Sequence, residues 1–318
     1  MSKPVCVVWM NESRVYEQAL ARAGLADGLE FHGVRADEAI PAELAARCEV
    51  LLAWRPKPGS LAAMPRLRWI QSSTAGVDQW LKAPDLRDEV ALACGRGSHR
   101  VSMPENILGT LFFLTKPLMH CALEQRASRW TRRMSEPLAG KTLGILGVGA
   151  IGQELARKCD ALEMKVIGTK RRPEPLPHVA KVYPPEAADE VLGASDFVLL
   201  LLPSTRDTEN FINARRLAAM KKTAWLLNFA RGALIVDADL IAAVKAKTIA
   251  GAVLDVFRQE PLPAEHPFWT TEGIYVWPHI GGGHPQRDVA VAEVFVGNVS
   301  RFLAGQPLQT LVDRSLGY

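Results

Sequence analysis

The sequence predicts an α/β protein that is built from two doubly wound parallel sheets. Short apolar segments of strand length alternate with amphipathic segments of helical period along most of the chain. Such alternation is typical of parallel strands joined by helices that cover both faces of a sheet. The pattern is established before residue 100 and starts anew after residue 140, so we expect two units. A length of 318 residues also suits two domains better than one.

The overall composition is ordinary for a globular protein, with 48% hydrophobic and 23% charged residues. The formal net charge is +4, and apart from one short cluster the cations are scattered, so we expect no nucleic-acid or membrane partner. The first ten residues hold too short an apolar run for a signal peptide, and no later stretch is long enough to span a bilayer. The five cysteines are odd in number and form no C-x-x-C pair, which favours reduced thiols in a cytoplasmic protein without a metal site.

The first unit is predicted to begin with a strand over residues 5–9 and a helix over 15–23. Two further buried strands are expected over 50–54 and 67–71. A helix over 103–116 follows a short polar loop, which is a natural place for the chain to cross to the second unit.

The loop after the strand at 67–71 consists mainly of small residues, from Ser72 to Asp78. Small residues at the carboxyl end of a parallel strand leave backbone amides exposed, so Ala75 and Gly76 are candidates to bind a carboxylate. A helix-capping loop is the alternative interpretation. Trp54 ends the neighbouring strand and is a further candidate for substrate binding, although a packing role explains it as well.

The segment from residue 141 to 172 predicts half of a dinucleotide-binding fold. An apolar strand over 142–146 is followed by the spacing G-x-G-x-x-G, then by a helix and a second strand over 164–168. The first glycine permits a tight turn, the second lets backbone approach a pyrophosphate, and the third lets the helix pack on the strand. The predicted cofactor-binding residues here are Gly147, Gly149, Ala150, Ile151 and Gly152.

Three adjacent cations, Lys170, Arg171 and Arg172, stand at the end of the second strand of this fold. A fold that prefers NAD usually places a carboxylate there for the ribose hydroxyls, whereas a 2′-phosphate needs cations. Arginine can grip a phosphate with two parallel hydrogen bonds. We therefore expect NADP(H) to be preferred, with NAD(H) possible; the alternative is a solvated basic turn.

The second unit continues the alternation. Strands are predicted over residues 197–202, 224–228, 251–256 and 275–277. Helices are predicted over residues 211–220 and 238–247. Arg231, Glu260 and His279 each follow one of the last three strands. Because the carboxyl ends of parallel strands share one edge of a sheet, we expect these side chains to meet there beside the nucleotide.

The chain resembles the D-isomer-specific 2-hydroxyacid dehydrogenases, and among them the glyoxylate/hydroxypyruvate reductases. The resemblance rests on long, collinear segments: STAGVD, TLGILGVGAIG, LLPSTRDT, LNFARGALIVD, IAGAVLDVFRQEPLP and VWPHIGG. It implies two Rossmann-like domains around a cleft, a catalytic triad of Arg231, Glu260 and His279, and a homodimer. It also implies a discontinuous substrate domain, residues 1–100 with 286–318, and a dinucleotide-binding domain of residues 101–285.

The chemistry of such a reductase suits these residue types. A 2-keto acid needs a hydride donor, a proton donor at its carbonyl oxygen and a cation for its carboxylate. Arg231 offers a planar fork for the carboxylate, His279 can donate the proton, and Glu260 would hold the other ring nitrogen and favour the protonated imidazole. We expect an NADPH-preferring reductase of small acids such as glyoxylate or hydroxypyruvate. The alternative is a non-catalytic nucleotide-sensing regulator on the same fold.

Further residues are expected at the cofactor or the substrate. Asp255, at the end of a buried strand, is expected from the resemblance to accept from the nicotinamide carboxamide, with a structural role as the alternative. Trp277 stands where the family commonly has a small hydroxyl residue, which leaves the identity of the substrate open. The other predicted cofactor contacts are Leu202, Pro203, Thr208, Ala230, His279 and Gly281.

Overall fold

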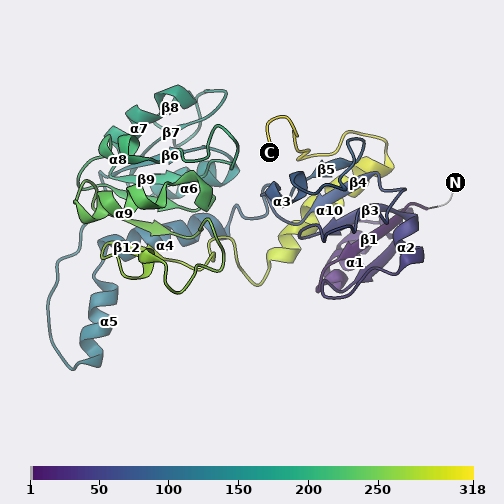
Figure 1. Cartoon of the computed structure of the whole chain (residues 1–318), viewed down its shortest axis with the longest axis horizontal. Coiled ribbons are helices and arrows are strands. Elements are labelled where there is room, and N and C mark those ends of the chain that lie inside the picture. Colours follow the sequence, from purple (N-terminus) through teal and green to yellow (C-terminus); the bar gives the residue numbers. More distant parts are fainter. Residues whose placement is uncertain (1–2) are drawn as a thin grey trace. The chain divides into compact units, whose positions relative to one another are not determined.

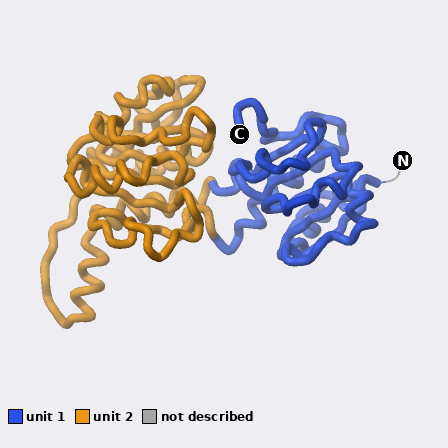
Figure 2. Tube along the Cα trace, in the orientation of Figure 1, with its two compact units in different colours: residues 1–99, 284–318 blue, residues 100–283 orange. Residues whose placement is uncertain are grey.

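The computed structural model describes residues 3–318 and is shown as a cartoon in Figure 1. It divides into two compact units (Figure 2), of which one comprises Met1–His99 and His284–Tyr318 and the other Arg100–Gly283. Met1 and Ser2 begin the segment in which we expect no signal peptide, and they lie outside the described residues.

The first unit is a five-stranded parallel sheet in the order β2-β1-β3-β4-β5. Its strands are β1 (Val5–Trp9), β2 (Glu30–Val34), β3 (Cys48–Ala53), β4 (Trp69–Ser72) and β5 (Ala91–Ala93). Residues alternate between the two faces along each strand, so each face has its own apolar core. One core contains α1 (Ser13–Arg22) and α10 (Arg287–Leu303), and the other contains α2 (Ala42–Arg47) and α3 (Asp78–Leu81).

The second unit is a seven-stranded parallel sheet in the order β12-β11-β10-β9-β6-β7-β8. Its strands are β6 (Thr142–Leu146), β7 (Lys165–Thr169), β8 (Lys181–Tyr183), β9 (Phe197–Leu200), β10 (Trp225–Asn228), β11 (Gly251–Leu254) and β12 (Ile274–Val276). One face packs on α4 (Ser102–Thr115) and α6 (Ala150–Asp160). The other packs on α7 (Ala188–Ala194), α8 (Ala214–Ala218) and α9 (Asp237–Lys245).

The order of the strands reverses between β6 and β9, which are hydrogen-bonded neighbours. In doubly wound sheets, ligands bind beyond the carboxyl ends of the strands at such a reversal. The turns that follow β6 and β9 are the glycine motif and the Leu202–Pro203 segment. The topology therefore brings two predicted parts of the cofactor site to the same point of the sheet edge.

A helical arm, which we define as α5 (Leu118–Arg126) with residues 127–137, extends away from the sheet of the second unit (Figure 1). None of the residues of α5 is buried. Large apolar side chains on the arm are exposed: Leu118, Met119, Leu123, Trp130 and Met134. An apolar surface of this kind is unusual on an isolated domain.

The two parallel sheets confirm the predicted α/β class, and β1 and β6 have the predicted bounds. The helix expected over 211–220 is wrong at its beginning, because Ile212 forms a bridge to Ile235 and Asn213 caps a shorter helix, α8. Among residues 3–318, no helix has both the length and the apolar character needed to cross a membrane. The five cysteines, all within the described part of the chain, form no disulfide bond.

Candidate active site

The glycine turn after β6 is shaped by close contacts of its first and third glycines. Gly147 has φ +98°, and a Cβ there would lie 3.0 Å from the carbonyl carbon and oxygen of Leu201. A Cβ on Gly152 would lie 3.4 Å from Ile145 Cγ2, so α6 packs closely on β6. The amides of Gly147 and Val148 donate to the carbonyl of Thr169 at 3.2 and 2.8 Å, which ties the turn to β7.

The N-terminus of α6 is open. None of the described side chains caps this helix, and no described atom outside Gly149 and its two chain neighbours lies within 4 Å of a Cβ placed on Gly149. Gly149 and Ala150 are exposed, whereas Ile151 packs partly against the core. Free amide groups and the helix dipole attract an anion at such an end. The turn therefore fits the pyrophosphate of a dinucleotide.

The basic cluster Lys170, Arg171 and Arg172 follows β7, as the sequence predicts, with both arginines exposed. The side chain of Lys170 forms an ion pair with the carboxylate of Glu174. The hydrogen bond from Lys170 lowers the pKa of Glu174 below its usual value. This carboxylate, which was not expected from the sequence, partly neutralises one of the three cations.

The turn after β9 is fixed by the hydroxyl of Thr208. This hydroxyl donates to the carbonyl of Pro203 at 2.6 Å and accepts from the amide of Thr205 at 2.8 Å. Leu202, Pro203 and Thr208 are half-buried. The hydroxyl of Thr208 thus stabilises the shape of the turn, and the expected cofactor contacts of these residues stay predictions.

Arg231 stands in a turn that is organised by a buried asparagine. Asn228, the last residue of β10, accepts from the amide of Ala230 at 3.1 Å and donates to the carbonyl of Arg231 at 2.9 Å. The Arg231 guanidinium donates to the carbonyl of Ala230 at 2.7 Å and is half-buried. Asn228 therefore determines the direction of the backbone that presents Arg231.

Gly232, the residue after Arg231, lets this turn pack against the segment that follows β11. A Cβ on Gly232 would lie 2.0 Å from the carbonyl carbon of Phe257, so only glycine fits there. The Arg258 guanidinium donates to the carbonyls of Ile235 and Ala233, at 3.0 Å and 3.2 Å. The segment that leads to Glu260 thus holds the Arg231 turn at two points.

Glu260 and His279 form the predicted pair. His279 Nδ1 lies 2.7 Å from Glu260 Oε2, and the other oxygen of Glu260 accepts from the amide of Phe257 at 2.9 Å. The side chains of His279 and Glu260 are 52% and 34% exposed in this unit, so the pair is accessible. The carboxylate is held at one oxygen by backbone and can orient the imidazole with the other.

Asp255 lies beneath the loop that carries His279 and is only 1% exposed. Its carboxylate accepts from the amide of Ile280 at 2.7 Å and from that of Gly281 at 3.0 and 3.1 Å. Burial raises the pKa of Asp255 to about 6, although the two amides oppose the shift. The structure therefore uses Asp255 to hold this loop, and its expected contact with the nicotinamide stays a prediction.

Trp277, two residues before His279, packs on α4. Its indole N–H donates to Thr110 Oγ1 at 3.1 Å, and its ring meets that of Phe113 edge to face at 5.1 Å between centroids. An aromatic ring at this position thus anchors the end of β12 to a helix.

The candidate substrate residues of the first unit lie at the ends of β3 and β4. Ala75 and Gly76 are half-buried, and no described group accepts a hydrogen bond from their amides. The loop is stabilised by Thr74, whose hydroxyl donates to the Gly76 carbonyl at 2.7 Å. Trp54 is 54% exposed, with the Arg55 guanidinium 4.7 Å from its ring centroid. This unit therefore presents two free amides, but their predicted role as a carboxylate site is not tested by the fold.

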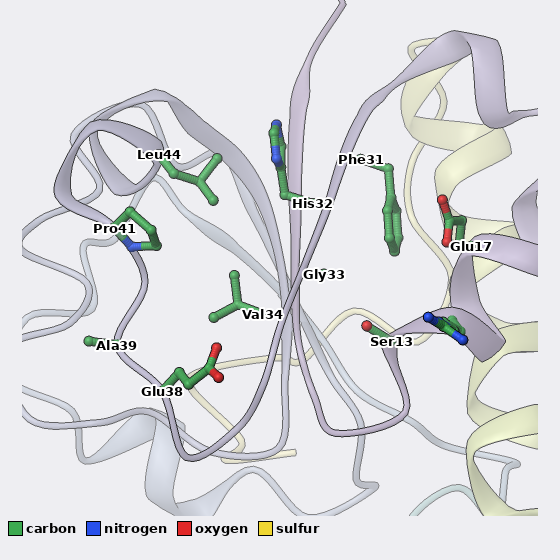
Figure 3. Close-up of a pocket in the computed structure, with 11 residues that line it drawn as sticks. Ser13, Glu17, Phe31, His32, Gly33, Val34, Glu38, Ala39, Pro41 and Leu44 are labelled. Carbon is green, nitrogen blue, oxygen red and sulfur yellow. The ribbon is translucent and has the colours of Figure 1, made fainter.

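A surface concavity of about 530 Å³ lies elsewhere on the first unit (Figure 3). It is lined by α1, β2, the segment before α2 and α2 itself, and it includes Ser13, Phe31, His32 and Leu44. Among the described residues that line it, none is a predicted site residue. The concavity is therefore separate from the candidate site.

The residues that position the site, rather than form it, were not predicted from the sequence. Asn228, Arg258 and Asn106 bind backbone carbonyls of loops that carry predicted catalytic residues. Asn228 could have been noticed, because a polar residue that ends an apolar strand is an unusual choice. Arg258 and Asn106 give no such signal in the sequence.

Comparison with known proteins identifies the family. Residues 108–281 match the model of the NAD binding domain of the D-isomer specific 2-hydroxyacid dehydrogenases. Glycerate dehydrogenase of Methylorubrum extorquens is 31% identical over 267 residues, which are 80% of this chain and 81% of that protein.

Two solved structures are similar over nearly the whole chain. A D-isomer specific 2-hydroxyacid dehydrogenase family protein from Aeromonas salmonicida has a TM-score of 0.88 and 33% identity, covering 98% of this chain and 100% of that one. An NADPH-dependent glyoxylate/hydroxypyruvate reductase from Sinorhizobium meliloti, in complex with NADP and sulfate, has a TM-score of 0.85 and 29% identity, with 100% of both chains covered. The chain therefore belongs to the D-isomer specific 2-hydroxyacid dehydrogenase family.

Proposed function

We propose that this dehydrogenase is an NADPH-preferring reductase that converts small 2-keto acids, such as glyoxylate or hydroxypyruvate, into D-2-hydroxy acids. The observation that carries the proposal is the hydrogen bond of 2.7 Å between Glu260 and His279, at the carboxyl edge of a sheet whose glycine turn fits a dinucleotide. The similarity to the Sinorhizobium meliloti reductase supports the choice of substrates and cofactor.

The cofactor would be held by residues around the reversal of the strand order. The glycine turn and the start of α6 would bind the pyrophosphate, and the basic cluster would bind the 2′-phosphate. Leu202, Pro203, Thr208, Ala230, Asp255 and Gly281 would shape the rest of the site. The bound nicotinamide supplies the hydride, which no side chain can provide.

The proton and the orientation come from this chain. Arg231 binds the substrate carboxylate and polarises the keto group, because its guanidinium is planar and always charged. His279 donates a proton from Nε2 to the carbonyl oxygen, while Glu260 holds Nδ1 and stabilises the positive charge before transfer. The amides of Ala75 and Gly76, together with Trp54, are proposed to complete the binding of the acid.

The helical arm supports a homodimer, which is part of the same proposal. Trp130 and Met134 are 93% and 91% exposed, and Leu118 is 65% exposed. Covering such side chains with a second copy would remove apolar area from water. A cytoplasmic location, consistent with the free thiols, completes the proposal.

Steady-state kinetics tests the activity and the cofactor together. We would measure kcat/KM for glyoxylate, hydroxypyruvate, pyruvate and phenylpyruvate with NADPH and with NADH. We expect NADPH to be preferred by about tenfold or more, which corresponds to about 1.4 kcal/mol. A preference for NADH would contradict the cofactor assignment, and no turnover of any acid would favour the nucleotide-sensing regulator.

Variants of the basic cluster then locate the preference. Replacing Arg171 and Arg172 by Ala should lower kcat/KM with NADPH and leave NADH almost unchanged, because only the 2′-phosphate needs these charges. Glu174→Gln should raise kcat/KM with NADPH by about twofold to fivefold, because it frees Lys170 from its carboxylate partner. Equal effects on both cofactors would show that the cluster acts on stability alone.

A further inference from the structure

The two residues after His279 are held by side chains on both sides of their backbone. Their amides donate to Asp255, as described above. Their carbonyls accept from one side-chain amide group: Asn106 Nδ2 lies 2.9 Å from the oxygen of Gly281 and 3.3 Å from that of Ile280. The peptide units of 280 and 281 are therefore fixed from opposite directions.

His279 needs such support because its backbone conformation is unfavourable. Its φ is +52°, in the left-handed region that residues with a Cβ rarely adopt. Its side chain is half-exposed, so core packing holds it weakly. A small rotation of this backbone would move Nδ1 away from Glu260 Oε2 and would redirect Nε2.

Helix α4 supplies the support on both flanks of His279. Asn106 binds the residues that follow it, and Thr110, one turn further along the same face of the helix, accepts from Trp277 before it. Asn106 itself is half-buried. An asparagine suits the position because its short amide group offers two donors to two carbonyls and adds no charge beside buried Asp255.

We propose that Asn106 is a positioning residue, which holds the 280–281 backbone so that the imidazole of His279 stays aligned with Glu260. The proposal rests on His279 being the acid of the proposed reductase. Asn106 acts through the loop and touches neither substrate nor proton. The titratable groups that face His279 are Glu260, which contacts its ring, and Asp255, which accepts from the amides of Ile280 and Gly281.

The test compares Asn106→Ala and Asn106→Ser with the wild-type protein. The control is Glu105→Gln on the same helix as Asn106. It breaks the ion pair of 3.2 Å between Glu105 and Lys158 of α6 and leaves the contacts of Asn106 intact. We expect both Asn106 variants to lose about tenfold in kcat, with KM for the keto acid changed much less. The alkaline limb of the reductive pH profile should also move to lower pH, because the imidazole loses its alignment with a carboxylate.

If Asn106 only stabilised the fold, the pH profile of its variants would differ from this expectation. Loss of folded protein would lower the rate equally at all pH values and would leave the profile unchanged, which would overturn the inference. A kcat within twofold of wild type would do the same.

An NMR titration of the His279 ring, assigned with His279→Gln, gives a readout that does not need turnover. If the wild-type protein reduces no acid, the proposed function fails, yet the inference still requires the ring to titrate at lower pH in the Asn106 variants than in Glu105→Gln. Identical titration in all proteins would overturn it.

Discussion

At the scale of single residues, the proposed reaction depends on how the half-exposed imidazole of His279 is oriented. The carboxylate of Glu260 is oriented by backbone, because its Oε1 accepts a hydrogen bond from the amide of Phe257. Its Oε2 therefore remains available to His279. A hydrogen bond to a charged partner is stronger than one between neutral groups, and this one lies within a partly solvated site. The contact therefore suits the role of proton donor that we propose for His279.

Glu260→Gln tests this contact directly. Glutamine keeps the size and one acceptor but removes the negative charge, so the protonated imidazole loses its electrostatic partner. We expect the alkaline limb of the reductive profile of kcat/KM to move to lower pH. Glu265→Gln, at an exposed position nearby, should leave the profile unchanged. An unchanged profile in Glu260→Gln would show that the pair does not act during proton transfer.

The bounds of a strand or helix can be predicted from the sequence where a single local signal determines them. The strands at residues 5–9 and 142–146 are apolar runs without competing signals, and both were predicted with the correct bounds. The helix expected from residue 211 fails because the Asn213 side chain accepts from the Arg216 amide and begins the helix there. The sequence of that segment has helical periodicity, but a local capping group takes precedence.

The candidate site shows the same division. Arg231, Glu260 and His279 could be named from motifs at the ends of parallel strands, because topology alone brings those ends to one edge. Asn106 could not, since its contact with residues 280 and 281 joins segments more than 170 positions apart. Nor could the Lys170–Glu174 pair, because side chains at such an exposed turn have no single preferred partner in the sequence.

Gly232 links two of the elements at the site and gives a prediction at that scale. A Cβ there would meet the backbone of Phe257 and Arg258 at 2.0–2.4 Å, so one of the two segments must move. We expect Gly232→Ala to lower the free energy of unfolding by about 1–3 kcal/mol and to abolish most activity, because the shift displaces Arg231 and Glu260 together. Urea unfolding and kcat/KM measure the two effects.

A second glycine provides the matched control. Gly109 lies within α4, and no described atom outside its own helical turn lies within 4 Å of a Cβ placed on it. Gly109→Ala should therefore raise the free energy of unfolding by roughly 0.5–1 kcal/mol. If Gly232→Ala behaved like Gly109→Ala, the tight contact between the Arg231 turn and the segment after β11 would be wrong.

At the scale of the whole molecule, each unit is complete as a sheet with two covered faces. The candidate cofactor site and all three predicted catalytic residues belong to the second unit, Arg100–Gly283. The same unit carries the helical arm. The exposed apolar side chains of the arm do not contribute to covering the sheet. The fold thus separates the residues for chemistry from the surface proposed for assembly.

This separation leads to a prediction about the oligomer. We expect the protein to sediment as a dimer at micromolar concentration. The double variant Trp130→Ser, Met134→Ser should sediment as a monomer, because the arm loses its two most exposed large apolar side chains. Trp269→Ser, which changes a tryptophan that is 51% exposed outside the arm, should remain dimeric. Since Arg231, Glu260 and His279 come from one chain, the monomer should keep its pattern of cofactor preference. A monomeric wild-type protein, or a double variant that still dimerises, would show that the arm does not mediate assembly.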